Sequence, residues 1–556
     1  MQIQVSTLIV RFLERLGIET IFGIPGAHIL PVYDALYDSS IESVLVKHEQ
    51  AAAFMAGGLA RATRGIGACI TTAGPGATNL ITGIANAYSD KLPVIAITGE
   101  APTHVFGKGG LQESSGEGGS VDQVQLFAGI TRYHKLVERT DYLANVLNQA
   151  ARHLLDELPG PVVLSIPFNL QKELVDEELL DQVSFVSARA STLVTEAAIS
   201  RCMALLRKAE RPMVVAGYGC IQAGGGRDLR QFSEHMDLAV TSTLKAKGVI
   251  DERSRCSLGS LGVTSAGYAL RYMREEADLI MLLGAGYNER TSYVWDNSLL
   301  QDKVIIQVDQ DPHQLEKVYR ADLAIQADLG AFLRAINAAC QASGEPLQRG
   351  IDIPSYQQRT QQAIDAAGET IFDGRFGHVK SFYRWLEQRF DDGLVMFDDN
   401  IIFAQNFYRF SERDRFYPNA GVSSLGHAIP AAIGAAFKLK KPMFAVLGDG
   451  GFHMCCMEIM TAVNHNIPLN IILFNNSTMG LIRKNQDQQY AGRFIDCDFI
   501  NPDYAALAQS FGISYQRIDG DSDWDALFRD TDFSGAINLI EISIEQDAYP
   551  NYSSRR

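Results

Sequence analysis

The chain has 556 residues, of which 46% are hydrophobic, and a formal net charge of -16 at pH 7. This length exceeds one ordinary hydrophobic core and predicts two to four compact units, and the composition excludes a disordered or fibrous protein. The negative charge repels phosphate backbones and anionic lipids, so we expect neither nucleic acid nor a membrane as a partner.

The sequence carries features of an intracellular protein. No apolar run approaches the roughly 20 residues needed to span a bilayer. The first segment, from Leu8 to Leu16, has the spacing of an amphipathic helix rather than of a signal peptide. The eight cysteines show no metal-ligand spacing and are expected to be reduced core residues. We therefore expect a cytoplasmic location.

The first block of the chain, to about residue 170, alternates short apolar runs with helical segments. The runs are bounded by Gly or Pro and read IETIFGIPG, SVLVKHE, GACITTAGPG, PVIAITGE and PVVLSIP. This alternation predicts a parallel sheet flanked by helices. We assign the block to an N-terminal domain at residues 1–175.

Two further blocks repeat the pattern. The second contains RPMVVAGYG, LAVTSTL, DLIMLLGAGY and KVIIQVDQD and predicts a central domain at residues 190–340. A polar stretch from about 341 to 375 has the composition of a linker. The third contains GLVMFDD, MFAVLGDG, LNIILFNN and INLIEIS and predicts a C-terminal domain at residues 376–556. The predicted fold class is α/β, with three doubly wound parallel-sheet domains.

Polar residues follow two strands of the third block. Asp449 is the last residue but one of the run MFAVLGDG, and Asn476 ends LNIILFNN. Open α/β sheets bind ligands at the carboxyl ends of their strands. Asp449, Asn476 and the backbone carbonyl of Thr478 can supply oxygen ligands to Mg²⁺. Backbone N–H groups of Gly450 and Gly451 can face a phosphate. Taken alone, GDG is an ordinary turn sequence.

In this βαβ setting, GDG followed by NN resembles the fingerprint of thiamine diphosphate enzymes. The resemblance to the acetohydroxyacid synthase (acetolactate synthase) group extends over essentially the whole chain, with three domains in the same order. It implies a pyrimidine-binding N-terminal domain, a middle domain and a diphosphate-binding C-terminal domain. It also implies thiamine diphosphate and Mg²⁺ as cofactors, and a homodimer or homotetramer with the active site between subunits.

The resemblance also assigns the residues of a cofactor site. Glu49, in KHEQ, matches the family glutamate that hydrogen-bonds the aminopyrimidine ring; in isolation it would be a charge at a helix N-terminus. Leu425 would bend the cofactor, although most leucines are core residues, and the Ser423 carbonyl would hold its exocyclic amine. The implied metal ligands are Asp449, Asn476 and Thr478. The implied cofactor-binding residues are Pro25, Glu49, Thr72, Asn79, Ser423, Leu425, Asp449, Gly450, Gly451, Asn476, Thr478, Met479 and Gly480.

Three residues face the substrate by the same resemblance: His28, Gln112 and Asn485. With Glu49 they form the predicted catalytic set. The synthases carry a small residue near position 28 and a tryptophan near position 485, so the chain departs from them at both places. PGAHI is similar to benzaldehyde lyase, and the His, Gln and Asn set is similar to cyclohexane-1,2-dione hydrolase. The alternative for His28 is a satisfied structural histidine.

Two further departures concern the cofactors. Where the synthases have Gly-Gln-His, this chain has Asn400, Ile401 and Ile402, so two polar phosphate ligands are missing. The middle domain resembles the FAD-binding domain of the synthases and implies FAD as a candidate cofactor. Their Gly-Gly-Gly turn is Gly-Tyr-Gly here, and a glycine-rich turn is weak evidence alone.

The implied reaction is the decarboxylation of a 2-keto acid such as pyruvate and carboligation to a second carbonyl, as in acetolactate synthase. The first alternative is a thiamine diphosphate-dependent lyase or hydrolase that acts on 1,2-diones or acyloins. The second is an inactive structural paralogue, which would not explain why Glu49, Asp449 and Asn476 are all intact. We expect a small keto acid or dione as the substrate.

Overall fold

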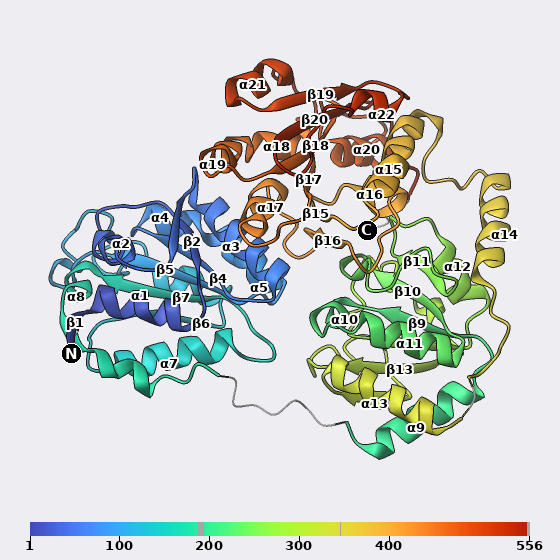
Figure 1. Cartoon of the computed structure of the whole chain (residues 1–556), viewed down its shortest axis with the longest axis horizontal. Coiled ribbons are helices and arrows are strands. Elements are labelled where there is room, and N and C mark those ends of the chain that lie inside the picture. The colour runs from blue at the N-terminus through green and yellow to red at the C-terminus, as the bar shows by residue number, and fades with distance from the viewer. Residues whose placement is uncertain (187–193, 345, 553–556) are drawn as a thin grey trace.

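The computed structural model describes residues 1–186, 194–344 and 346–552. Figure 1 shows three lobes, each built on a six-stranded sheet with helices on its faces. Every strand pair within these three sheets is parallel, which confirms the predicted α/β fold class. Each predicted domain range contains one sheet, and the exact limits of the domains stay a prediction.

The N-terminal sheet has the strand order β3-β2-β4-β5-β7-β6. Its strands are β2 Thr20–Gly23, β3 Glu42–Leu45, β4 Gly67–Thr71, β5 Val94–Glu100, β6 Tyr133–Leu136 and β7 Val162–Pro167. Its helices are α1 Val5–Arg15, α2 Leu30–Tyr37, α3 Glu49–Thr63, α4 Pro75–Asn79, α5 Ile81–Ser89, α6 Gln123–Ala128, α7 Leu143–Leu154 and α8 Phe168–Gln171. A separate antiparallel pair, β1 (Gln2–Gln4) with β8 (Leu174–Asp176), joins the two ends of this lobe.

The C-terminal sheet repeats the same topology, with the order β16-β15-β17-β18-β20-β19. Its strands are β15 Val395–Asp398, β16 Arg415–Pro418, β17 Met443–Gly448, β18 Leu469–Asn475, β19 Ser514–Ile518 and β20 Ile537–Ser543. Its helices are α15 Gly377–Arg389, α16 Ile402–Phe407, α17 Ala428–Ala436, α18 Asp449–His453, α19 Ile459–Asn464, α20 Gly480–Gln489, α21 Tyr504–Phe511 and α22 Trp524–Leu527. The first and third blocks thus share a strand order as well as a sequence pattern.

The central sheet has a different order, β11-β10-β9-β12-β13-β14. Its strands are β9 Pro212–Ala216, β10 Ala239–Thr243, β11 Ser257–Leu261, β12 Leu279–Leu283, β13 Val304–Asp309 and β14 Leu323–Gln326. Its helices are α9 Glu196–Lys208, α10 Tyr218–Gln222, α11 Gly226–Met236, α12 Tyr268–Glu275 and α13 Leu329–Ala342. The chain order reverses between β9 and β12, which makes that place the switch point of the sheet.

Two local expectations differ from the structure. The stretch expected as a linker contains α14 (Ile353–Ala366), which packs on the central lobe with the rings of Tyr272 and Tyr356 5.2 Å apart. The segment between GDG and NN, which the βαβ setting predicts to be one helix, is broken into α18, a 3-10 turn at Cys456–Glu458, and α19. Among the described residues, no helix is both long and apolar enough to cross a bilayer.

The N-terminal and C-terminal lobes meet along α3 and α17 (Figure 1). Both helices are rich in Ala and Gly and almost wholly buried. A Cβ on Gly58 would lie 2.1 Å from the carbonyl oxygen of Ala431, and one on Gly434 would lie 2.1 Å from that of Met55. The helices therefore touch backbone to backbone. Met55 comes before Gly58 in α3, whereas its partner Gly434 comes after Ala431 in α17, so the two helices are antiparallel.

Replacing Gly58 by Ala should destabilise the chain by about 1–3 kcal/mol, because the added methyl must displace the Ala431 backbone. Gly57→Ala is the matched control one residue earlier. Its Cβ would meet only the Leu92 side chain at 3.6 Å, so it should be neutral or stabilise α3 by about 0.5–1 kcal/mol. The urea midpoint measures both variants. Equal midpoints for the two would contradict the close helix contact.

Candidate active site

Glu49 begins α3 at the surface of the N-terminal lobe. The preceding residue, His48, caps the helix, and its side chain accepts a hydrogen bond from the Gln50 N–H. Asn79, at the end of α4, donates its amide to Oε2 of Glu49 at 2.9 Å. The Glu49 side chain is half-buried. The structure thus brings together two of the predicted cofactor residues and fixes the direction of the carboxylate.

Three other predicted residues of this lobe converge from separate segments. Nδ1 of His28 lies 3.3 Å from Oε1 of Gln112, and the Thr72 hydroxyl donates to the same oxygen at 3.4 Å. Pro25 is exposed in the same turn as His28, and a Cβ on Gly26 would lie 2.6 Å from Cβ of Thr72. This half-site, which we call the N-terminal half-site, consists of Glu49, Asn79, Pro25, His28, Thr72 and Gln112.

Asp449 is the centre of a second half-site in the C-terminal lobe. Its Oδ2 accepts hydrogen bonds from the N–H groups of Asn476 (3.1 Å) and Ser477 (2.7 Å) and from Nδ2 of Asn501 (2.9 Å). Its Oδ1 accepts from the Gly450 N–H at 2.9 Å. Burial raises the pKa of Asp449, and these hydrogen bonds oppose that rise. A cation beside the carboxylate would favour its charged form.

The turn after β18 packs closely against the start of α18. Ser477 has a positive φ of 53°, and the N–H of Met479 donates to the Cys497 carbonyl at 2.7 Å. Thr478 is buried and donates its hydroxyl to Oδ1 of Asp498 at 2.7 Å. A Cβ on Gly450 would lie 2.6 Å from the Met479 sulfur. One on Gly480 would lie 2.7 Å from Nδ2 of Asn476, so a side chain at either position would displace Met479 or Asn476.

The turn before α17 completes this C-terminal half-site. A Cβ on Gly451 would lie 3.9 Å from Cβ of Leu425, which places Leu425 beside the start of α18. Asp399 accepts hydrogen bonds from the N–H groups of Gly426, His427 and Ala428 and so holds the turn. Burial raises the pKa of Asp399 to about 7. The C-terminal half-site therefore consists of Ser423, Leu425, Asp449, Gly450, Gly451, Asn476, Thr478, Met479 and Gly480.

The segment that departs from the synthases supports the same turn. Asn400 has a left-handed φ of 64° and donates its amide to Ser423 Oγ at 3.2 Å. The Ile401 N–H donates to Oδ1 of Asp398 at 2.7 Å, and Ile402 begins α16. Asn400 thus fixes the Ser423 turn. Asn485 lies half-buried in α20, the helix that follows the turn at residues 476–479.

Sequence reasoning missed three residues that hold the predicted ones. Asn501 donates to Asp449 and also to Oδ1 of Asn475 at 2.7 Å. Asp399 holds the Leu425 turn. Glu458 accepts hydrogen bonds from the N–H groups of Lys47 and His48, both at 2.9 Å, and so fixes the turn that leads into Glu49. The one sequence signal was the Asn501-Pro502 pair, which indicates a turn.

Comparison with known proteins gives the family. Models of the thiamine pyrophosphate enzymes match three ranges: the N-terminal TPP-binding domain at residues 3–125, the central domain at 199–336 and the C-terminal TPP-binding domain at 400–535. The chain belongs to the thiamine pyrophosphate enzymes. Thiamine pyrophosphate is the same compound as thiamine diphosphate, so the family confirms the predicted cofactor.

Individual relatives cover nearly the whole chain. The chain is 31% identical to a probable acetolactate synthase large subunit of Methanocaldococcus jannaschii, over 97% of this chain and 91% of the relative. It is 31% identical to the acetolactate synthase isozyme 2 large subunit of Escherichia coli, over 97% and 95%. It is 29% identical to an acetolactate synthase large subunit of Corynebacterium glutamicum, over 92% and 82%.

The C-terminal half-site fits a magnesium diphosphate. Among the described residues, no group of three or more His, Cys, Asp or Glu side chains could hold a metal ion. A metal here would therefore use one carboxylate together with amide and backbone oxygens, and Mg²⁺ prefers few carboxylates plus phosphate oxygens and water. The glycines at 450 and 451 leave the backbone beside Asp449 free of side chains, as close approach of a diphosphate requires.

Asn501→Ala should weaken the binding of thiamine diphosphate and Mg²⁺ by about 10- to 100-fold, because Asp449 loses the side-chain donor that orients it. Titration followed by calorimetry or circular dichroism measures the affinity. Asn297→Ala, at an exposed asparagine of the central lobe, is the matched control and should bind normally. Wild-type affinity in Asn501→Ala would show that the contact does not position the ligand.

Proposed function

We propose that this chain decarboxylates pyruvate and joins the remaining two-carbon unit to a second pyruvate, giving acetolactate and carbon dioxide. The observation that carries this proposal is the pair of intact half-sites, Glu49 with Asn79 in one lobe and Asp449 with Asn476 in the other. Relatives named as acetolactate synthases, similar along nearly the full chain, support the substrate. The intact contacts argue against the inactive paralogue.

Each group has a separate task. Asp449, Asn476 and the Thr478 carbonyl would hold Mg²⁺, and the Gly450 and Gly451 N–H groups would bind the diphosphate. When bound, the cofactor supplies the electron sink for decarboxylation. Glu49 would share a proton with the pyrimidine ring nitrogen. Asn79 donates to Oε2 of Glu49 and so leaves Oε1 for that proton.

We infer that the site forms between two chains, because the half-sites lie at opposite ends of the α3–α17 pair. Glu49 precedes Met55 by six residues, and Ala428 precedes Gly434 by six, while Met55 and Gly434 are in contact. At 1.5 Å per residue, the starts of the two antiparallel helices are about 18 Å apart. One aminopyrimidine ring cannot reach both Glu49 and the Ser423 turn of the same chain. A homodimer is the smallest assembly that supplies both, and a homotetramer would also do so.

A second candidate function rests on the polar N-terminal half-site. His28 and Gln112 are held within hydrogen-bonding distance of each other. Such a pair can bind a water molecule or a second carbonyl of a substrate, as the cleavage of a 1,2-dione or an acyloin requires. Asn485, in place of the bulky tryptophan of the synthases, leaves further polar space.

Hybrid dimers test the proposed placement of the site. Glu49→Gln and Asp449→Ala should each be nearly inactive with pyruvate, because each removes one half-site. Chains of both variants, unfolded together and refolded, should regain about a quarter of wild-type activity. Half of the dimers are then hybrids, and each hybrid has one intact site out of two. A refolded mixture as inactive as its parents would contradict a site shared between chains.

Product analysis tests the reaction itself. Wild type given pyruvate alone should release carbon dioxide and acetolactate. With pyruvate plus a cyclic 1,2-dione or an acyloin, His28→Ala and Asn485→Trp should change the product ratio by about 5- to 150-fold, since unpaired polar groups cost about 1–3 kcal/mol. Chromatography quantifies acetolactate, acyloins and ring-opened acids. Dione cleavage without acetolactate would favour the second candidate, and unchanged ratios would remove His28 and Asn485 from the reacting centre.

A further inference from the structure

The turn that leads into Glu49 is held by a side chain of the other terminal lobe. Glu458 ends the 3-10 turn between α18 and α19 and is only 2% exposed. Its Oε1 accepts hydrogen bonds from the N–H groups of Lys47 and His48, both at 2.9 Å. Its Oε2 accepts one from the Thr461 hydroxyl at 2.8 Å. A residue of the C-terminal lobe thus fixes the backbone just before Glu49 in the N-terminal lobe.

The turn before α17 is held in the opposite direction, from the N-terminal lobe. Asn86, in α5, donates its amide to Oδ1 of Asn419 at 2.8 Å, and Asn419 donates its own amide to the carbonyl of Ser424. Both asparagines are buried. Because Asn86 occupies the Asn419 oxygen, the Asn419 amide nitrogen must face Ser424, which lies between Ser423 and Leu425. Asn86 therefore orients the support of the turn that carries both predicted cofactor residues.

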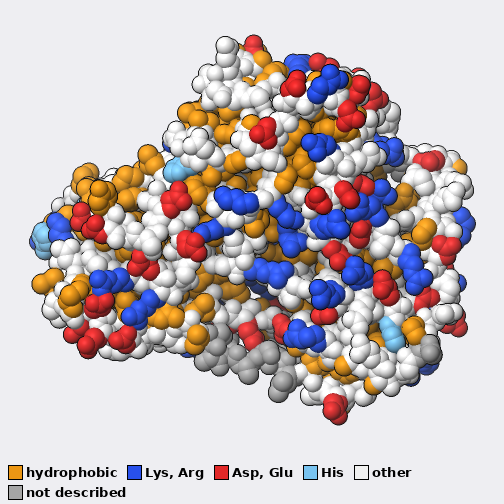
Figure 2. Space-filling view, in the orientation of Figure 1, with side chains coloured by type: hydrophobic (Ala, Val, Ile, Leu, Met, Phe, Trp, Pro, Cys, Tyr) orange, Lys and Arg blue, Asp and Glu red, His pale blue; other side chains and the backbone are white. Residues whose placement is uncertain are grey.

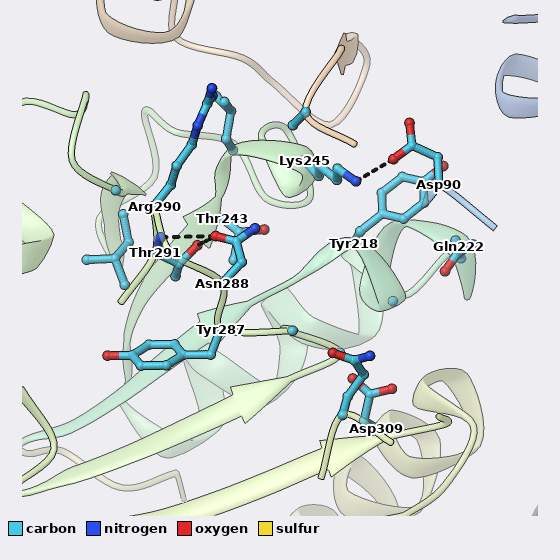
Figure 3. Close-up of a pocket in the computed structure, with 18 of the residues that line it drawn as sticks. Asp90, Tyr218, Gln222, Thr243, Lys245, Tyr287, Asn288, Arg290, Thr291 and Asp309 are labelled. Carbon is cyan, nitrogen blue, oxygen red and sulfur yellow. Dashed lines mark hydrogen bonds and ion pairs between the residues drawn. The ribbon is translucent and has the colours of Figure 1, made fainter. Parts of the chain in front are cut away.

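Charged residues of the N-terminal lobe contact the same turn. Arg61 donates to the Pro418 carbonyl at 3.3 Å and pairs with Asp90. A Cβ on Gly421 would lie 2.8 Å from Oδ1 of Asp90, so this carboxylate packs against the turn. Figure 3 shows Lys245 of the central lobe pointing to the same carboxylate. The N-terminal lobe therefore holds the turn at more than one place.

The two supports cross between the lobes, whereas the outer side of each turn is open. The side chains of His48 and Ser423 are exposed, as are Leu45 (51%) and Val422 (43%). Figure 2 shows hydrophobic side chains on the surface of both terminal lobes. Each turn is thus fixed from within its own chain and is free to meet a second chain on its outer side.

We propose that Glu458 and Asn86 are positioning residues that serve different active sites of the dimer. Glu458 positions Glu49 for one site, and Asn86 positions the Ser423 turn of the same chain for the other. This inference rests on the proposed function, because it requires a site shared between chains. Small displacements of reacting groups are costly, since about 1 Å of misplacement can slow a reaction about 100-fold.

Hydrogen exchange of the chain without cofactor tests the two contacts independently of activity. Glu458→Met fills a similar volume but removes both acceptor oxygens, so the N–H groups of Lys47 and His48 should exchange about tenfold faster or more. Glu458→Gln keeps an acceptor and should restore protection. Asn86→Asp removes the donor to Asn419, so it should speed exchange in residues 419–426 and leave Lys47 and His48 unchanged.

Hybrid dimers of Glu49→Gln and Asp449→Ala chains test which active site each residue serves. The one intact site of such a hybrid takes Glu49 from the Asp449→Ala chain and Asp449 from the Glu49→Gln chain. Glu458→Met should lower kcat about tenfold or more when placed on the chain that supplies Glu49, and most activity should remain when it is placed on the other. Asn86→Asp should show the reverse dependence.

Lys438→Gln is the matched control. It breaks the ion pair between Lys438 and Glu19, which crosses the same lobe boundary outside both turns. It should leave hydrogen exchange in both turns and activity in both placements unchanged.

The outcomes separate this proposal from the one on which it rests. An inactive hybrid without any third substitution would overturn the shared site, and this proposal with it. An active hybrid that loses the same activity for either placement of Glu458→Met or of Asn86→Asp would overturn only this proposal. Unchanged exchange in both turns, or equal effects from Lys438→Gln, would overturn it as well.

Discussion

The backbone contact between α3 and α17 is the constraint on which the rest of the structure depends. It exists because positions 58 and 434 carry no side chain, so that each helix rests on a carbonyl of the other. The contact joins the N-terminal and C-terminal sheets through one shared hydrophobic core. Because the helices are antiparallel, the same contact turns their two starting ends, with Glu49 and Leu425, away from each other. The separation of the half-sites is therefore a consequence of the packing.

A buried cluster of charged residues that includes Arg61 of α3 connects the N-terminal lobe to the central lobe. Arg61 of α3 pairs with Asp90 and donates to the carbonyl of Pro418 in the C-terminal lobe. Lys245 of the central lobe pairs with the same aspartate. A buried charge is costly unless it is paired and hydrogen-bonded, so this cluster is satisfied only when all three lobes are in place.

The sequence predicted the central strands of each sheet and missed most of the edges. Strands β5 and β12 are buried along their whole length, and both contain a continuous apolar run, VIAI in β5 and LIMLL in β12. The unpredicted strands β6, β11, β14, β16 and β19 all lie at sheet edges. The strand β14 alternates buried and exposed residues, and β19 has a single fully buried residue, so neither stands out from a loop by composition. Pairing with an inner strand, which no local pattern records, is what makes them strands.

The residues of the candidate site also differ in whether a local sequence motif predicts them. Asp449 and Glu49 could be predicted because each ends a strand or opens a helix, and motifs record such positions. Their supports could not, because Asn501 and Glu458 reach them across the fold from other segments. Glu458 is buried and Asn501 is half-buried, whereas Pro25 and Ser423 are exposed. Each half-site is thus held in place by contacts within its own chain and is open at the surface of that chain. A second chain could complete such a half-site without disturbing the contacts that hold it.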